Sequence, residues 1–150
     1  MQKTNPVIDC LMNHRSIRKF KSNPIPEETI DTILRAGTRA ATAGCMQPYA
    51  FIVLDDPEVL KKVCYIPAPL AIVAVVDLYR VKRYYELNDA PFYNDQAVNL
   101  FISYWDATIA LHNVVVAAES LGLGGVYVGM VLSQDLRESL GVPEYVVPAG

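Results

Sequence analysis

A short basic segment near the start of the chain is the first candidate for chemistry. Residues 14–20 read His-Arg-Ser-Ile-Arg-Lys-Phe and carry no acidic side chain. Arg15 and Arg18 supply forked, charge-assisted donors, and Ser16 adds a hydroxyl, a combination that suits a phosphate group. The same composition is typical of a solvated basic face. Taken alone, the segment leaves both interpretations open.

A glycine-rich segment later in the chain is the second candidate. Residues 122–129 read Gly-Leu-Gly-Gly-Val-Tyr-Val-Gly and follow a long apolar stretch. Closely spaced glycines allow a flat ligand to approach the backbone. A helix C-cap followed by a glycine-tolerant strand explains the same residues, so this segment also has two interpretations.

Signatures of other chemistries are missing from the sequence. His14 and His112 are the two histidines, and neither accompanies a Gly-x-Ser-x-Gly elbow or a catalytic cysteine context. Tyr127 stands where a dinucleotide-binding Gly-x-Gly-x-x-Gly motif needs its third glycine. The three cysteines are widely spaced, which suits neither a zinc site nor a disulfide framework. Nucleophilic catalysis, a Rossmann site and a metal site are therefore not predicted.

Composition places the chain among folded, mildly acidic proteins. Its 150 residues are 52% hydrophobic and 19% charged, with a formal net charge of −3. These values exclude a disordered segment and a general attraction to nucleic acid or anionic membranes. The apolar stretch 66–76 contains prolines and is too short to span a bilayer, and the first residues lack a signal-peptide pattern. We expect one domain located in the cytoplasm, with no nucleic-acid or membrane partner.

The elements that must position the two candidate segments follow from hydrophobic periodicity and turn residues. Residues 97–121 are apolar around nearly the whole circumference of the expected helix, so this helix must be buried on all sides. Because the chain is short, a second copy is expected to pack against it. Helices are expected from residue 6 to residue 14 or 15, and over 26–37 (with a possible extension to 41), 58–63, 97–121 and 134–140. Residues 77–96 are expected to form a helix followed by a loop. Strands are expected over 49–54, 70–76, 125–131 and near 147.

The order and combination of these motifs resemble the FMN-dependent nitroreductase family. The resemblance extends from about Val7 to Pro148 and is closest to the NADPH-preferring, oxygen-insensitive nitroreductase and flavin reductase branch. It is carried by His-Arg-Ser-Ile-Arg at 14–18, Gln47-Pro48 before a strand, Asp-Leu-Tyr-Arg at 77–80, Asp106, and Ala-Ala-Glu-Ser-Leu-Gly-Leu-Gly-Gly-Val-Tyr-Val-Gly at 117–129.

The resemblance implies an α+β fold, in which helices flank a central mixed β-sheet, and an intertwined homodimer with one FMN per subunit at the dimer interface. A fixed cation beside the flavin would stabilise the negative charge that two-electron reduction places near N1. No side chain is expected to be a catalytic acid. The implied FMN contacts are His14, Arg15 and Ser16 at the phosphate and ribityl chain, Arg18 at the pyrimidine edge, Thr42 and Gln47 in a loop, and Tyr127, Val128 and Gly129 beside the ring.

Two parts of the family pattern are absent from the sequence. The chain passes from Cys64-Tyr65 to Pro67-Ala68-Pro69, where relatives carry a segment that contains Gly-Gly-Gln. It also stops at Gly150, before the C-terminal arm whose Lys-x-Arg pair grips the FMN phosphate in relatives. Residues 1–150 are therefore expected to form a single nitroreductase-like FMN-binding domain without this arm.

The prediction for function is a flavoenzyme that transfers a hydride from NAD(P)H through FMN to nitroaromatics, quinones or flavins. Its partners are then a second copy of the chain and small aromatic electron acceptors. The alternative is a truncated or degenerate member that serves as a dimeric flavin-binding module without turnover.

Several polar and aromatic residues also have a purely structural interpretation. His14 could cap the first helix, and Asp106 could accept backbone donors. His112 and Asn113 could form a hydrogen-bonded core pair. An aromatic group could line a substrate mouth or pack on its own helix; it consists of Tyr84, Tyr85, Phe92 and Tyr93.

Overall fold

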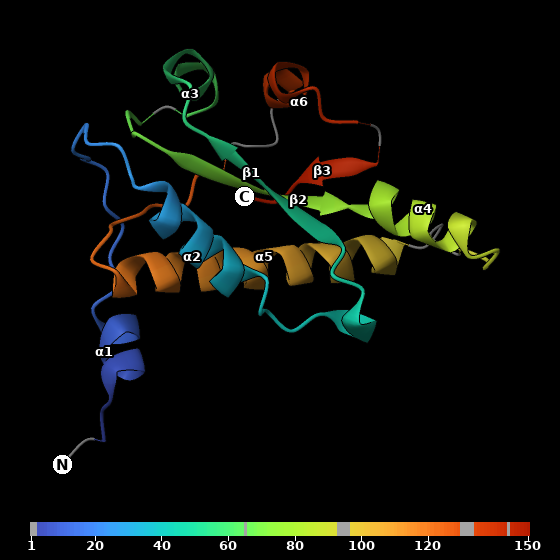
Figure 1. Cartoon of the computed structure of the whole chain (residues 1–150), viewed down its shortest axis with the longest axis horizontal. Helices are drawn as coiled ribbons and strands as arrows, with labels where there is room; N and C mark the ends of the chain where they lie inside the picture. Colours follow the sequence, from blue (N-terminus) through green and yellow to red (C-terminus); the bar gives the residue numbers. More distant parts are fainter. Residues whose placement is uncertain (1–2, 65, 93–96, 130–133, 144) are drawn as a thin grey trace.

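The computed structural model describes residues 3–64, 66–92, 97–129, 134–143 and 145–150. Figure 1 shows the long helix α5 running below the sheet, with α2 beside it and α1 at its C-terminal end. The helices are α1 (Pro6–Met12), α2 (Glu27–Gly37), the 3-10 turn η1 (Ala43–Cys45), α3 (Pro57–Val63), α4 (Leu78–Leu87), α5 (Ala97–Ser120) and α6 (Gln134–Leu140); the strands are β1 (Tyr49–Leu54), β2 (Ala71–Asp77) and β3 (Val146–Pro148).

The described strands form a sheet in the order β1-β2-β3, and both pairings are antiparallel. The register pairs Tyr49 with Val76 in the first ladder and Val75 with Pro148 in the second. Ala74 extends the second ladder through backbone bonds to Ala149 and Gly150. The central strand β2 is thus the buried strand that its continuous apolar pattern predicts. The parallel pairing expected in a mixed sheet does not occur among the described strands.

Hydrophobic side chains on the two faces of the sheet belong to two different cores. Val73 and Val75 point into a cluster with α3, whereas Val76 and Tyr49 pack against Ala107 and Ala110 of α5. Alternate residues of a strand point to opposite faces, which explains this division. Figure 1 shows the resulting layers, with α3 and α6 on one side of the sheet and α5 on the other. The described elements thus combine helices with a sheet, as the α+β expectation requires.

Capping residues define where several helices begin. The Asn5 side chain accepts hydrogen bonds from the backbone of Val7 and Ile8, both at 3.0 Å, and Pro6 occupies the first helical position. Asp56 and Asp77 cap α3 and α4 in the same way. Helix α1 ends at Met12, before the predicted end at residue 14 or 15, and α2 ends at Gly37 without an extension to residue 41.

The predicted strand over residues 125–131 is wrong for the part that the structure describes. Residues 123–128 have no regular secondary structure, and residues 130–131 lie outside the described ranges. The alternation of Val126, Tyr127 and Val128 is typical of a strand, but no described strand lies beside them to complete a ladder. Contacts with the basic segment and with α5 hold this segment instead, as described below.

Helix α5 buries only part of its apolar surface within one chain. Ala107, Ala110 and Val114 are buried, but Phe101 and Trp105 are more than 60% exposed. The expectation that the helix is buried on all sides is therefore not met by a single chain. Its length and hydropathy also match those of a membrane span, a test that core helices of soluble proteins pass as well. The packing of α5 against the sheet and α2 identifies it as a core helix.

Candidate functional site

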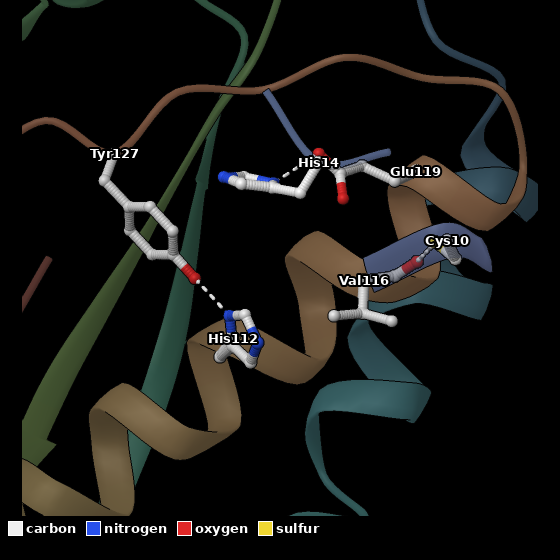
Figure 2. Close-up of polar contacts among 6 residues, drawn as sticks. All are labelled: Cys10, His14, His112, Val116, Glu119 and Tyr127. Atoms are coloured by element: carbon white, nitrogen blue, oxygen red, sulfur yellow. Dashed lines mark hydrogen bonds and ion pairs between the residues drawn. The ribbon is translucent and has the colours of Figure 1, made fainter. Parts of the chain in front are cut away.

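The C-terminal half of α5 fixes the start of the basic segment. His14 Nδ1 lies 2.7 Å from Glu119 Oε1, in an ion pair whose carboxylate side chain is only 14% exposed (Figure 2). The Cys10 thiol donates to the Val116 carbonyl oxygen at 3.7 Å and holds α1 against the same end of α5. Asn13, not His14, occupies the C-cap position of α1. The imidazole of His14 therefore connects the basic segment to α5, and its Nε2 faces away from Glu119.

Ile17 joins the two candidate segments directly. Its backbone N–H donates to the Gly125 carbonyl oxygen at 2.9 Å. A Cβ atom on Gly124 would lie 2.7 Å from Cγ1 of Ile17, so only glycine permits this close approach. The basic segment and the glycine-rich segment, far apart in the sequence, consequently form one surface.

The cations on this surface are free to bind an anion. Arg15, Arg18 and Lys19 are exposed, and none of them forms an ion pair with the residues that the structure describes. A Cβ atom on Gly125 or Gly129 would meet nothing within 4 Å, so the space beside these two glycines is open. Forked cationic donors near backbone that is open at Gly125 and Gly129 fit a flat ligand that carries a phosphate, such as FMN.

Tyr127 is held over α5 by a histidine. Its hydroxyl lies 3.0 Å from His112 Nδ1, and the donor in this hydrogen bond depends on the histidine tautomer (Figure 2). Burial raises the pKa of Tyr127, and the negative charge of Glu119 raises it further. The phenol therefore stays protonated at neutral pH. The expected His112–Asn113 core pair is not formed, because Asn113 donates to the Ala36 carbonyl of α2 at 3.5 Å.

The loop that carries Thr42 and Gln47 is attached to the other half of α5. The backbone N–H of Ala43 donates to both carboxylate oxygens of Asp106, at 3.1 and 3.2 Å. Asp106 is only 5% exposed, and burial raises its pKa while the Ala43 N–H partly lowers it. The interpretation of Asp106 as a backbone acceptor agrees with this geometry. Thr42 Oγ1 accepts from the Gln47 N–H at 3.4 Å, which closes the loop on itself.

Arg80 fixes the end of this loop where it enters β1. Its guanidinium donates to the carbonyl oxygens of Gln47 at 2.6 Å and Tyr49 at 2.7 Å. Gln47 has a positive φ of 47°, a conformation that these bonds hold in place. In the sequence, Arg80 is only the last residue of the Asp-Leu-Tyr-Arg motif at 77–80, for which no role was predicted. Its position at the start of α4, three residues after the capping Asp77, is the signal that could have suggested one.

The structure brings some of the predicted site residues together and separates others. The basic segment, which carries His14, Arg15, Ser16 and Arg18, lies against Gly124 and Gly125 of the glycine segment through Ile17. Asp106 and Glu119, which anchor the two parts of the candidate site, lie about 20 Å apart along α5 at 1.5 Å per residue. Figure 1 likewise places η1 and α1 toward opposite ends of α5. One chain therefore does not bring Thr42 and Gln47 to the basic segment.

Part of the aromatic group packs over the loop of Thr42 and Gln47. The Tyr85 hydroxyl donates to Met46 Sδ at 3.8 Å, and its ring lies 5.4 Å from that of Phe92. Tyr84 meets Tyr85 edge-on and is 66% exposed. Tyr93 lies outside the described residues. These contacts connect α4 to the loop, in addition to packing within α4 itself.

An apolar cavity of about 190 Å³ lies beside the glycine segment. Its walls come from residues 123–128, α5 and β2, and include no lysine, arginine or histidine. Cys64 lines it, and burial raises the pKa of this thiol. The lining therefore offers no cation to hold a phosphate, although Phe20 of the basic segment contributes to it.

Comparisons with known proteins agree with this fold. The nitroreductase family profile matches residues 11–149. An NADPH-dependent oxidoreductase of Staphylococcus saprophyticus is 34% identical over 95% of this chain and 61% of its own length. NfrA2 of B. megaterium superposes with a TM-score of 0.91 at 33% identity, covering 97% of this chain and 63% of that one. The NADPH:FMN oxidoreductase of Vibrio harveyi, complexed with NAD+, superposes with a TM-score of 0.83 at 30% identity. The match covers 96% of this chain and 65% of that one.

The fold is thus that of a nitroreductase, and the matched residues span nearly the whole sequence. The chain belongs to the nitroreductase family, which confirms the resemblance drawn from its motifs. It spans about three fifths of the length of the curated relatives that it matches.

Proposed function

We propose that this chain is an FMN-dependent NAD(P)H oxidoreductase that reduces nitroaromatics, quinones or flavins. The observation that carries the proposal is the backbone bond from Ile17 to Gly125, which joins a cationic segment to an open glycine-rich backbone. The family, and the activities named for its relatives, support the same reaction class.

The basic segment would hold the phosphate end of the cofactor. Arg15 offers a forked guanidinium, Ser16 a hydroxyl, and His14 the ring nitrogen that does not face Glu119. That nitrogen donates to an anion when the imidazole is protonated. These side chains give the basic segment a local positive charge, although the net charge of the full chain is −3.

Bound FMN would supply the hydride chemistry, accepting two electrons from NAD(P)H and giving them to the acceptor. The protein contributes position and charge. Arg18 provides a cation that stabilises negative charge on the reduced ring, and the backbone of residues 127–129 provides a flat border without bulky side chains at Gly129. No described side chain is required as an acid.

The complete site would form between two copies of the chain. Phe101, Trp105 and Ile109 make an exposed apolar face on α5, which a second copy could cover. Two α5 helices packed antiparallel would bring the Asp106 end of one beside the Glu119 end of the other. Thr42 and Gln47 of one subunit would then approach the basic segment of its partner. Because NAD(P)H is an intracellular reductant, we place the reaction in the cytoplasm.

The test is anaerobic stopped-flow mixing of the FMN-loaded chain with NADPH and with NADH. The proposal expects the flavin absorbance to bleach and then to recover when a quinone or a nitroaromatic is added. FMN that binds but is not bleached by either nicotinamide would favour the dimeric flavin-binding module. A chain that fails to bind FMN would overturn both functions.

A further inference from the structure

Four titratable side chains form two hydrogen-bonded pairs along the C-terminal half of α5. We define the α5 polar cluster as His112 and Glu119 of the helix together with their partners, Tyr127 and His14 (Figure 2). Glu119 also acts on Tyr127 through its charge, which raises the pKa of that phenol. The cluster therefore links α5 to both candidate segments at once.

The two helix residues of the cluster share one face of α5. His112 and Glu119 are seven residues apart, which is almost two complete turns. Each contacts a different segment: His112 contacts Tyr127 at 3.0 Å, and Glu119 contacts His14 at 2.7 Å. The backbone bond from Ile17 to Gly125 joins the two segments to each other. Each segment is therefore held both by α5 and by the other segment.

The glycine segment depends on such contacts because no ladder holds it. Residues 123–128 form no strand, and glycine backbones lose the most conformational entropy when they are fixed. His112 is exposed and Tyr127 is 46% exposed, so the pair contributes little to the hydrophobic core. A surface hydrogen bond that fixes a coil segment is better suited to hold a site than to stabilise the fold.

We propose that His112 and Glu119 are positioning residues for the flavin site. His112 sets the place of the glycine segment through Tyr127, and Glu119 sets the place of the basic segment through His14. Neither needs to touch the cofactor. This inference rests on the proposed function, but its first test does not require flavin.

The Ile17 amide is the reporter for that test, because its bond to Gly125 joins the basic segment to the glycine segment. Residue-resolved hydrogen exchange is measured on the chain without FMN, in wild type and in His112→Phe, Tyr127→Phe and the double variant. A lost neutral hydrogen bond should speed exchange of the Ile17 amide about fivefold. The double variant should match either single variant, because both remove the same bond.

Conservative variants sharpen the test. His112→Asn places an amide atom close to the position of Nδ1 and should restore most of the protection at Ile17. Glu119→Gln keeps an acceptor for His14 and should leave the exchange rate near that of wild type, whereas Glu119→Leu should raise it. Thr108→Ala is the matched control, since Thr108 lies on the same face and bonds only within its own helix, to the Trp105 carbonyl.

The second measurement is FMN affinity, from quenching of flavin fluorescence. His112→Phe and Tyr127→Phe should each weaken FMN binding about fivefold, His112→Asn should recover it, and the thermal midpoint should move little. If wild type binds no FMN, the proposed function fails while the exchange result still decides whether the cluster positions the segments. Unchanged Ile17 exchange in His112→Phe, or additive effects in the double variant, would overturn the inference.

Discussion

The free cations of the basic segment determine the electrostatics of the proposed site at the scale of single residues. Arg18 is exposed and forms no ion pair with a described residue. Its removal should destabilise reduced flavin by about 1.5–3 kcal/mol, which lowers a two-electron potential by about 30–60 mV. Arg18→Ala should show this decrease in a dye-equilibration measurement, and Lys19→Ala should not. An unchanged potential in Arg18→Ala would mean that Arg18 is only a solvated surface residue.

Exposure of the same cations predicts how FMN binding responds to salt. Arg15 is accessible to counterions, so its attraction for a phosphate is screened as ionic strength rises. FMN affinity should fall with added salt, whereas the affinity for riboflavin, which has no phosphate, should hardly change. Arg15→Ala should weaken FMN binding about ten- to a hundredfold and reduce its salt dependence. Titration of stripped protein with both flavins checks this, and salt-independent FMN binding would place the phosphate elsewhere.

Asp106 gives the stability of the fold a defined pH dependence. Burial raises its pKa above the usual 3.8, so the folded protein binds this proton more tightly than the unfolded chain. The contribution of protonated Asp106 to stability is complete below pH 3.8. It is lost as the pH rises through the pKa that Asp106 has in the folded state. Asp106→Asn keeps an oxygen that can accept from Ala43 but removes the titration.

The measurement for Asp106 compares urea unfolding across that pH range. The stability of wild type relative to Asp106→Asn should decline as pH rises above 3.8. Asp106→Ala, which leaves the Ala43 N–H without its acceptor, should lose about 1–3 kcal/mol. Parallel pH profiles for wild type and Asp106→Asn would contradict the raised pKa.

At the scale of elements, the approach of α2 to α5 depends on a glycine. A Cβ atom on Gly37 would lie 2.6 Å from Cγ2 of Val114 and 2.9 Å from the ring of Phe51. Gly37→Ala should therefore force the helices apart and cost about 1–3 kcal/mol, despite the better helix propensity of alanine. Gly125→Ala has open space and serves as the control in thermal unfolding. Equal stability of both variants would show that α2 adjusts at no cost.

Most elements could be predicted because their local signals agree with their packing. The cap at Asn5, the apolar run of β2 and the uninterrupted helix α5 all occur where periodicity and turn residues place them. The segment 125–131 was the exception, since a Val-Tyr-Val alternation cannot reveal whether a neighbouring strand exists. Tertiary context decides that question, and here it supplied a histidine and an isoleucine instead.

The candidate site could be predicted only in part for a similar reason. Motif order identified the basic and glycine-rich segments, and the bond from Ile17 to Gly125 shows that they meet. Contacts between side chains on different elements, such as His112 with Tyr127, leave no trace in local patterns. The separation of Thr42 and Gln47 from the basic segment is likewise a property of the length of α5, which motif matching does not measure.

At the scale of the whole molecule, one chain exposes more surface than its mass requires. Its accessible surface is 10256 Å², whereas a compact monomer of 16.6 kDa exposes about 7,600 Å². The open apolar face of α5, with Phe101 and Trp105 both more than 60% exposed, contributes part of this surface. We expect a homodimer that buries more than about 2,000 Å² and has no stable folded monomer.

Sedimentation and one substitution test this expectation. Trp105 is 64% exposed and lies at the centre of the open face, so Trp105→Glu should abolish the dimer and lower the thermal midpoint. Glu58→Gln, on α3 at the opposite side of the sheet, is the control and should leave the mass unchanged. A folded wild-type monomer at micromolar concentration would refute the dimer.

The contact between His14 and Glu119 joins residues that are 105 positions apart in the sequence. A chain emerging from the ribosome therefore carries its basic segment long before Glu119, which fixes that segment, has been synthesised. The intervening sheet and helices must first be in place, because closing so long a loop costs entropy that no local contact repays. On the proposed function, we accordingly expect FMN to bind only after the ribosome has translated the glycine segment.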